Sequence, residues 1–482
     1  MINIQPISNV VGVLLILIGI VMLGCLPFSF YYGSEDVYAL TISGFITIGV
    51  GIAAWSFRFS SETQVNKREG YLIVTLGWIS MTLAGVLPYM ISGVIPTFAE
   101  AFFESVSGFT TTGASVLQNI EATPKGILFF RSITQWIGGM GIIVLTVALF
   151  PMLGIGGIEL FSAEAPGPTS NKIHPRIKET AKRLWFIYFG LTVLLCIIFW
   201  CVGMNFYDAI NHALTTMATG GFSTKNASMA FFPPHIQYIT IFFMFLAGVN
   251  YTVIYLGLTG KFKRVWANEE FRAYLLVVLV LTVIVGGTIV SVLDIKAEQA
   301  FRDALFQVVS LITTTGFVSA DYTQWTSSIM IICFALLFIG ACAGSTSGGI
   351  KLIRHLVFFK NTLLEFQRIL HPRAIIRLKI NKQIVSARIL THILVFLLVY
   401  IATFVIGTFV VTALGMDMIS AASAAATALG NVGPGLGSVG PVNNFADVPS
   451  TAKVVLSFLM LLGRLELFSI LVLFTPYFWK LN

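Results

Sequence analysis

The chain has 482 residues, of which 56% are hydrophobic and 10% are charged, and its formal net charge is +8. This composition excludes a soluble globular protein and predicts a helical membrane protein, because each membrane-crossing helix needs ~20 largely apolar residues. The five cysteines lie in apolar stretches without CxxC spacing, and the six histidines form no HExxH cluster. Neither a disulfide framework nor a resident metal site is therefore expected.

Apolar stretches recur along the whole chain and predict ten transmembrane helices. They lie near residues 8–31, 37–58, 71–93, 127–150, 184–204, 237–259, 273–293, 327–358, 389–415 and 454–478. The first stretch follows a very short, uncharged N-terminus and lacks a small-residue cleavage site before Pro27. We therefore expect it to be a retained helix rather than a signal peptide.

The basic residues predict the orientation of these helices. If the N-terminus is cytoplasmic, 22 of the 29 lysines and arginines fall on the inner side, six fall on the outer side, and Arg464 lies within a span. Such an asymmetry follows the positive-inside rule and places both termini in the cytoplasm. Membrane orientation and contact with anionic lipids explain the basic balance better than nucleic-acid binding does.

Four short segments end on a similar glycine-containing turn. They read FTTTGAS around Gly113, MATGGFS around Gly221, ITTTGFV around Gly316 and GNVGPG around Gly433, and they lie 108, 95 and 117 residues apart. Alanine stands twelve residues before each glycine, and a serine or threonine stands six before, namely Ser107, Thr215, Ser310 and Thr427. We expect these hydroxyls to bond the local helix backbone or to pack against a neighbouring span, not to bind a ligand.

The residues before each glycine predict four re-entrant half-helices, at 98–112, 206–220, 301–315 and 418–432. Each segment is too short and too polar to cross a bilayer, since about 12 helical residues reach only ~18 Å. Glu100, Asp208 and Asp303 lie at the start of the first three, where a helix dipole favours negative charge. They could simply stabilise these helix ends, attract cations to the outer mouth, or do both.

Four such turns in register predict a ring of main-chain carbonyls around one axis. A dehydrated potassium ion needs several oxygens of modest field strength, and potassium filters supply them from backbone carbonyls. Glycine tolerates the dihedrals that turn successive carbonyls towards an axis. The alternative is four ordinary glycine turns between helices.

The eighth span is interrupted by residues 343–349, which include six consecutive Gly, Ser and Thr residues. These residues hold a helix poorly, and irregular backbone within a membrane is tolerated where it lines a cavity or is buried in protein. The stretch lacks the GxxxxGK[ST] pattern of a phosphate-binding loop. A flexible kink that serves helix packing is the alternative to a loop in the ion pathway.

The tenth span contains Arg464 and Glu466. A charge within a span is costly and indicates function, and a fixed cation beneath a cation filter would form an electrostatic barrier. The alternative is an arginine paired between helices for structural reasons. The two residues do not share a helix face, so Glu466 is expected to hold a neighbouring helix or the 343–349 loop. His212, in the second half-helix, is a weaker candidate for the ion pathway.

These features resemble the TrkH family, the membrane subunits of Trk-type bacterial potassium uptake, in the superfamily that includes KtrB and the plant HKT transporters. The resemblance covers essentially the whole chain, including the helix pair before residue 60. It implies an all-α polytopic protein with four helix–pore-loop–helix repeats around a pseudo-fourfold pore, each quarter resembling a potassium channel subunit. It also implies a homodimer in which each chain has its own pore.

The resemblance assigns the filter and the gate to particular residues. The implied filter residues are Thr111, Thr112, Gly113, Thr219, Gly220, Gly221, Thr314, Thr315, Gly316, Asn431, Val432 and Gly433. The implied gate, an intramembrane loop below the filter with a pore-facing arginine, consists of Gly344, Ser345, Thr346, Ser347, Gly348, Gly349, Lys351, Arg464 and Glu466. The fourth copy lacks threonine, and Gly220 leaves the register of the second copy ambiguous by one position.

The chain divides accordingly into six segments. They are the N-terminal helix pair 1–68, the pore repeats 69–150, 184–260, 272–360 (with a broken second helix) and 389–482, and the basic cytoplasmic loop 361–388. By resemblance, the cytoplasmic face docks on a TrkA-type cytosolic ring. This chain has no GxGxxG motif, so a nucleotide is expected only on that partner, and no organic cofactor is expected here.

Together these predictions describe potassium uptake across the bacterial inner membrane, driven by the electrical gradient through a gated channel-like pore. A proton- or sodium-coupled potassium symporter on the same scaffold is the alternative, although only Glu466 and His212 could act as titratable groups near the midplane. A polytopic membrane enzyme is disfavoured, because no span has paired acids, an HExxH motif or a Ser/His/Asp set.

Overall fold

The structure is a computed structural model that describes residues 3–56, 66–144, 173–293 and 295–480. The described residues are predominantly helical, with one two-stranded antiparallel sheet of β1 (Lys379–Ile380) and β2 (Gln383–Ile384). The ends of the spans predicted near 37–58 and 127–150 lie outside the described residues. The mostly helical architecture confirms the predicted fold class.

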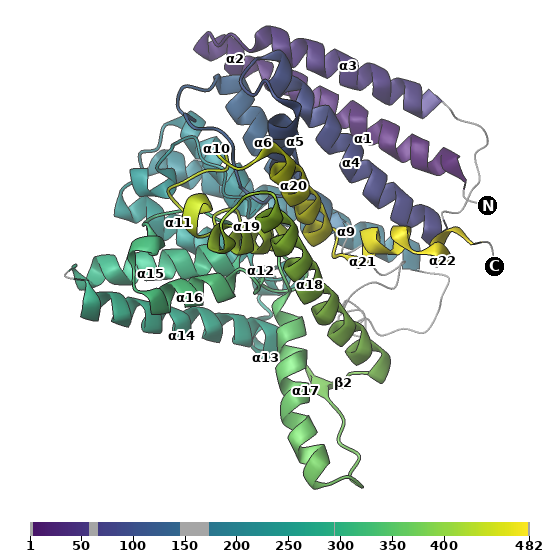
Figure 1. Ribbon diagram of the computed structural model, residues 1–482, viewed down its shortest axis with the longest axis vertical. Coiled ribbons are helices and arrows are strands. Elements are labelled where there is room, and N and C mark those ends of the chain that lie inside the picture. Colours follow the sequence, from purple (N-terminus) through teal and green to yellow (C-terminus); the bar gives the residue numbers. More distant parts are fainter. Residues whose placement is uncertain (1–2, 57–65, 145–172, 294, 481–482) are drawn as a thin grey trace.

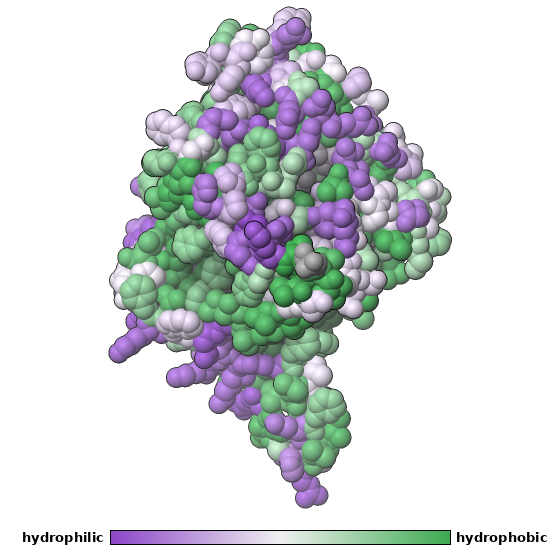
Figure 2. Space-filling view, turned by 90° about the vertical axis from the view of Figure 1, so that its left-hand side faces the viewer, coloured by the Kyte–Doolittle hydropathy of each residue, from purple (hydrophilic) through white to green (hydrophobic). Residues whose placement is uncertain are grey.

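Six helices are long and apolar enough to cross a membrane among the described residues. They include α1 (Ile4–Gly24) continued by α2 (Leu26–Tyr32), α3 (Val37–Ser56), α4 (Lys67–Ile91), α9 (Ile173–Cys201), α14 (Glu269–Val292) and α18 (Ala387–Ala413). Helices α14 and α18 expose large apolar side chains such as Leu276, Val283, Leu398 and Phe409. Exposed apolar helix faces of this kind are suited to lipid, and Figure 2 shows hydrophobic residues spread over much of the visible face.

Two of the remaining predicted spans are sharply bent rather than straight. Helix α11 (Pro234–Ala247) meets α12 (Tyr251–Leu258) at 107°, and α20 (Ser450–Arg464) meets the segment Phe468–Phe474 at 106°. Asn250 caps α12 by accepting a hydrogen bond from the Thr252 N–H at 2.8 Å. Glu466 and Leu467 break the second helix with φ angles of 55° and 50°.

The eighth predicted span is broken, as expected, between α16 (Ser327–Leu336) and α17 (Leu352–Leu370). With each bent pair taken as one span, up to eight candidate spans are present among the described residues. The ten spans and four half-helices therefore remain a prediction in number. Helix α17 projects away from the helical body (Figure 1).

A short helix lies at each of the four positions predicted for a half-helix. They are α5 (Phe98–Phe109), α10 (Phe206–Met217), α15 (Ala297–Ile312) and α19 (Met418–Gly430). Each packs against the long helix before it and the helix after it, including α6 (Lys125–Val144) in the first repeat. Helix α10 also contacts α6, α15 contacts α11, and α20 contacts α5, so helices of the last repeat lie beside those of the first.

The other elements are short. They are the helices α13 (Phe262–Ala267), α21 (Phe468–Leu471) and α22 (Pro476–Trp479), and the 3-10 turns η2 (Ser228–Phe231), η3 (Tyr322–Gln324), η4 (Gly437–Val439) and η5 (Val472–Phe474). Helices α1, α3 and α4 run side by side at one edge of the molecule (Figure 1), so the N-terminal pair packs on the first helix of the first repeat.

Candidate ion pathway and gate

The four glycine-containing loops meet and close a ring. A Cβ atom added at any of the four glycines would lie less than 3.0 Å from a carbonyl oxygen of another loop. The contacts run from Gly113 to the Gly220 oxygen, Gly221 to the Thr315 oxygen, Gly316 to the Val432 oxygen, and Gly433 to the Thr112 oxygen. The loops therefore follow one another in chain order around the ring, and the fourth contacts the first.

The four loops share one backbone register. The residue two before each glycine has a positive φ, with values of 55° at Thr111, 53° at Thr219, 55° at Thr314 and 54° at Asn431. Positive φ is uncommon outside glycine. Its recurrence at one position therefore shows that the four loops have the same backbone conformation in the same register. The glycines that match are Gly113, Gly221, Gly316 and Gly433, which also have positive φ. Gly220 thus corresponds to Thr112, and the ambiguity of the second copy is resolved.

Side chains behind the loops hold this conformation in different ways. In the first and third copies two threonine hydroxyls bond each other, Thr110 to Thr112 at 2.7 Å and Thr313 to Thr315 at 2.8 Å. In the fourth copy the amide of Asn431 donates to the Thr112 hydroxyl at 3.0 Å and to the Met460 carbonyl at 2.9 Å. The Asn431 side chain therefore links the fourth loop to the first.

The hydroxyls six residues before the glycines lie within the half-helices, as expected. Thr215 bonds the helix backbone at the Asn211 carbonyl at 3.1 Å, whereas Ser310 bonds the returning chain at Phe317 at 2.7 Å. The carbonyls of all four residues accept a main-chain hydrogen bond from the residue before the glycine. This shared bond, at 2.9 Å from Thr112 to Ser107 in the first copy, ends each half-helix in the same way.

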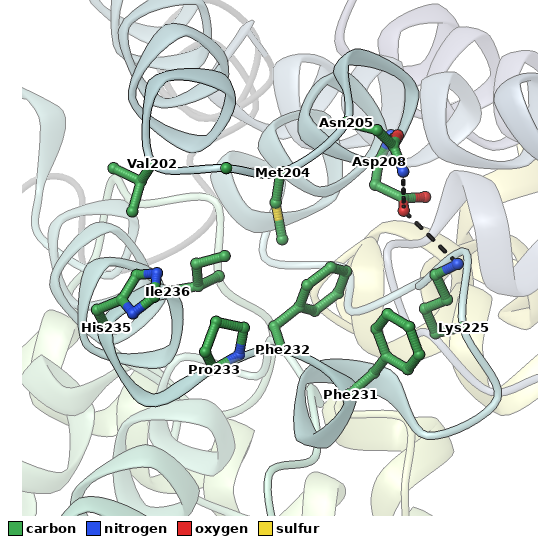
Figure 3. Close-up of a pocket in the computed structure, with 11 residues that line it drawn as sticks. Val202, Met204, Asn205, Asp208, Lys225, Phe231, Phe232, Pro233, His235 and Ile236 are labelled. Atoms are coloured by element: carbon green, nitrogen blue, oxygen red, sulfur yellow. Dashed lines mark hydrogen bonds and ion pairs between the residues drawn. The ribbon is translucent and has the colours of Figure 1, made fainter.

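Two of the three acids expected at half-helix starts, Glu100 and Asp208, lie in a first helical turn and are held by neighbouring side chains. The prediction was wrong for Asp303, because α15 begins six residues earlier, at Ala297, and has Glu298 in its first turn. Glu100 accepts a hydrogen bond from Lys453 at 2.7 Å, and this contact, with a second from Thr97, lowers the pKa of the carboxyl. Asp208 lies 3.6 Å from the Lys225 ammonium (Figure 3). These contacts stabilise both acids and offset their negative potential. The fourth half-helix has its own acid, Asp417, which caps α19; the alignment on glycines missed it because it lies outside the matched position.

A surface pocket lies at the start of α10 (Figure 3). Asp208 and Lys225 line it together with Phe231, Phe232 and Pro233. No predicted filter or gate residue lines this pocket. The pocket is therefore separate from the ring of loops, and it offers no evidence about ion selectivity.

His212 braces the second half-helix. Its Nδ1 bonds the Asp208 carbonyl at 2.7 Å and its Nε2 bonds the Ser223 hydroxyl at 2.9 Å. The Nδ1 bond lies within α10, and the Nε2 bond joins α10 to the chain that returns after Gly221. This arrangement supports a structural role for the histidine.

The predicted gate loop lies directly against the ring. The Thr346 hydroxyl contacts the carbonyls of Met217, at the end of α10, and Ala247, at the end of α11, at 3.1 and 3.3 Å. The Gly348 N–H donates to the hydroxyl of Thr314, a predicted filter residue, at 2.6 Å. The loop is therefore hydrogen-bonded to the structure that carries the second and third glycine turns.

Arg464 is 2% exposed and joins three parts of the molecule. From α20 its guanidinium donates to the Thr346 carbonyl of the gate loop and to the Gly138 carbonyl of α6, both at 2.9 Å. Lys351 contacts the Ser347 carbonyl of the same loop. The structure thus gathers the predicted loop, lysine and arginine at one place.

Glu466 has a different partner from Arg464. Its carboxylate pairs with Arg354 on α17, the helix that follows the gate loop, and both side chains are largely buried. This is the neighbouring-helix contact expected from the two-residue spacing. The ion pair therefore connects the break after α20 to α17, the helix that follows the gate loop.

The sequence interpretation missed a further carboxylate at the loop, Glu270. It is 1% exposed in the first turn of α14, and its Oε1 accepts hydrogen bonds from the N–H groups of Ala343 at 2.7 Å and Ile353 at 3.2 Å. One carboxylate oxygen therefore bonds the chain at the start of the gate loop and just after its end. An acid at the start of an apolar span is a usual helix-end residue, so only the tertiary structure reveals this contact.

A buried ion pair within the first repeat also contacts the second repeat. Arg131 on α6 lies 2.6 Å from Glu104 on α5, with both side chains at most 2% exposed. Arg131 also stacks on the Phe222 ring at 3.5 Å and donates to the Ser223 carbonyl at 3.2 Å. Glu104 accepts a further bond from the Val116 N–H at 2.9 Å. The return loops, which are the segments that follow Gly113 and Gly221, are therefore both bonded to this pair. The sequence interpretation counted Arg131 only as an outer charge.

We expect Glu104→Gln to destabilise the protein by about 3 kcal/mol or more, because it leaves the Arg131 charge buried without its counter-ion. Thermal unfolding of the purified protein in detergent measures this loss. Glu121→Gln, at an exposed position of the first return loop, is the matched control and should unfold at the wild-type temperature. Equal unfolding temperatures for all three proteins would contradict the expected role of the pair.

Fold and site together define a multi-pass helical membrane protein in which one chain supplies four similar loops to one ring. Comparison with known families makes the assignment specific. The TrkH family, described as cation transport proteins, matches residues 37–480. The chain belongs to the TrkH family.

Similar proteins agree with this family over almost the whole chain. The chain is 40% identical to the Trk system potassium uptake protein TrkH of Salmonella typhimurium and to that of Escherichia coli K12, with 99% of each chain covered. It also resembles the crystal structure of the potassium transporter TrkH from Vibrio parahaemolyticus, with a TM-score of 0.91 at 37% identity. That match covers 99% of this chain and 100% of the other.

Proposed function

We propose that this chain is the membrane pore of a Trk-type system and takes up potassium across the bacterial inner membrane. Membership of a cation transport family and the printed names of its relatives support this substrate and this setting. The positive-inside distribution supports cytoplasmic termini. The same family membership argues against the polytopic-enzyme alternative.

The observation that carries the proposal is the closed ring of glycines and carbonyls. Each loop places a glycine of positive φ against the carbonyl of the next loop in the ring. Four loops of one conformation concentrate main-chain oxygens around one point, which suits a dehydrated monovalent cation. The twelve residues from Thr111 to Gly113 and at the three matching positions are the proposed filter.

The proposed gate is the 343–349 loop together with Arg464. The loop is bonded to Thr314 of the proposed filter, and the guanidinium is bonded to the loop. A loop in this position obstructs the path on one side of the ring, and the arginine adds a fixed positive charge there. Release of the Arg464 contacts would lower both barriers together.

A coupled symporter remains the alternative, since it could use the same scaffold. Coupling needs a group that gains and loses a proton, or a second ion site, in the pathway. Glu466 is paired with Arg354, and both nitrogens of His212 are bonded. These partners favour a pore driven by the electrical gradient over a proton-coupled cycle.

We further propose a homodimer whose cytoplasmic face binds a TrkA-type nucleotide-binding ring. The projecting α17 and the following loop expose basic side chains, including Arg373, Arg377, Lys379 and Lys382. Such a surface fits an acidic partner face or lipid head groups. Nucleotide would then act on the partner, and this chain would bind only its transported ion. The six segments given above are its proposed domains.

Reversal potentials of the reconstituted chain test the proposed function. In opposed potassium and sodium gradients we expect the potential to follow the potassium gradient, because the ring offers neutral carbonyls rather than charged ligands. A proton gradient imposed alone should leave it unchanged. A reversal potential that tracks the proton or sodium gradient would contradict the proposed pore and favour the coupled symporter.

A further inference from the structure

The second loop of the proposed filter lacks the threonine pair that braces the first and third. Thr110 and Thr112 in the first copy correspond to Ala218 and Gly220 in the second. Neither residue has a hydroxyl. The second loop nevertheless keeps the same positive φ at Thr219 and Gly221 as the other copies. A group outside the loop must therefore hold it.

Gln135 of α6 supplies that group. Its Nε2 donates to the Gly220 carbonyl at 2.6 Å, and its Oε1 accepts from the Phe222 N–H at 3.1 Å. The amide thus bonds the chain on both sides of Gly221. Gln135 is fully buried at 0% exposure, and a buried amide is stable only with such partners. Both ends of the amide are used on this one loop.

The same contact explains why glycine stands at position 220. The three atoms nearest to a Cβ added there are Cδ, Oε1 and Nε2 of Gln135, all closer than 3.0 Å. The glutamine amide therefore occupies the volume that a threonine side chain fills in the first and third loops. Gly220 and Gln135 form a matched pair.

The bond also changes the chemistry of one oxygen in the ring. The four ring carbonyls are those of Thr112, Gly220, Thr315 and Val432. Of these four carbonyls, only that of Gly220 accepts a hydrogen bond from a described residue, and the donor is Gln135. A carbonyl oxygen has two lone pairs, so this oxygen has less electron density to offer a cation than the other three.

We infer that Gln135 is a specificity-determining residue, which positions the second filter loop and weakens one of its four ring carbonyls towards the ion. The inference rests on the proposed function, since it assigns a role within the proposed filter. It predicts that ion discrimination depends on a side chain outside the four filter segments.

Replacement of the amide by an isostere tests the inference. Gln135→Met keeps the volume and removes both hydrogen bonds. We expect the potassium-to-sodium permeability ratio to fall roughly three- to tenfold, the effect of losing the one bond that reaches a ring carbonyl, at Gly220. Gln135→Glu keeps the acceptor for Phe222 but loses the donor, and should also lower the ratio. Permeability ratios come from reversal potentials of reconstituted protein.

Gln237→Met is the matched control. Gln237 on α11 is also a buried glutamine that bonds backbone, at Met229 and Phe232, and neither carbonyl belongs to the ring. We expect this variant to lose stability and keep the wild-type permeability ratio. A fall of the same size in both variants would reduce Gln135 to a packing residue and overturn the inference.

A reciprocal change keeps the test decisive if Gln135→Met folds poorly. Ala218→Thr with Gly220→Thr rebuilds the threonine pair, but the side chain introduced at position 220 would clash with Gln135, and potassium flux should be lost. Adding Gln135→Ala should restore flux, because the threonine pair then positions the loop in place of Gln135. No recovery would overturn the inference. Wild-type protein without potassium-selective flux would instead refute the proposed function itself, and the inference with it.

Discussion

Arg464→Ala is expected to raise the basal potassium flux about tenfold or more in the absence of any regulatory partner. The change removes a fixed charge and two hydrogen bonds that hold the gate loop, at the carbonyls of Thr346 and Gly138. A unit charge ~8 Å from a passing cation contributes about 2 kcal/mol at an effective dielectric constant of ~20. Potassium or rubidium flux into proteoliposomes measures the result.

Arg464→Lys separates the two contributions. It keeps the positive charge but has no planar fork to bond both carbonyls. If charge dominates, its flux stays near the wild-type value; if the hydrogen-bonded loop dominates, its flux rises towards that of Arg464→Ala. An alanine variant of normal stability with unchanged flux would show that Arg464 is a structural residue and not part of the gate.

The second large effect is expected at the ring itself. Gly316→Ala should reduce potassium uptake at least a hundredfold, because φ at Gly316 is +76° and the added Cβ would meet the Val432 carbonyl, a backbone atom that cannot move aside cheaply. Rubidium uptake by proteoliposomes and growth at low potassium of cells without other potassium uptake both report the loss. Gly287→Ala in α14 is the control, since a Cβ there meets nothing within 4 Å.

Normal uptake by Gly316→Ala would contradict the ring as the selective site. Uptake that persists without discrimination against sodium would place conduction in the ring but leave selectivity to another part of the pathway. The two outcomes are distinguished by measuring both ions in the same vesicles.

The sequence predicted the positions of the four short helices before the glycines well, because these helices depend on local features. Amphipathic stretches of about 12 residues, a terminal glycine and an acid near the first turn are short-range properties. The break at 343–349 was visible for the same reason. Helix α15 begins at Ala297, four residues before the predicted start at residue 301, and this difference does not move Gly316.

The contacts that organise the site were not predictable, because their partners lie far apart in the chain. The bend between Ala247 and Tyr251 depends on a cap from Asn250 that resembles an ordinary polar residue in sequence. Gln135 bonds a loop 85 residues away in the chain. The buried carboxylate of Glu104 is explained only by its ion pair with Arg131. Hydropathy and spacing do not report such long-range pairs.

The four loops of the ring come from one chain and are braced by different side chains, namely a threonine pair in two copies, Gln135 in the second and Asn431 in the fourth. In a channel assembled from four identical subunits, one altered codon changes all four ligands at once. Here one codon changes one quarter of the site and leaves three intact. Ion preference can therefore be adjusted in small steps during evolution, and an engineer can grade it quarter by quarter.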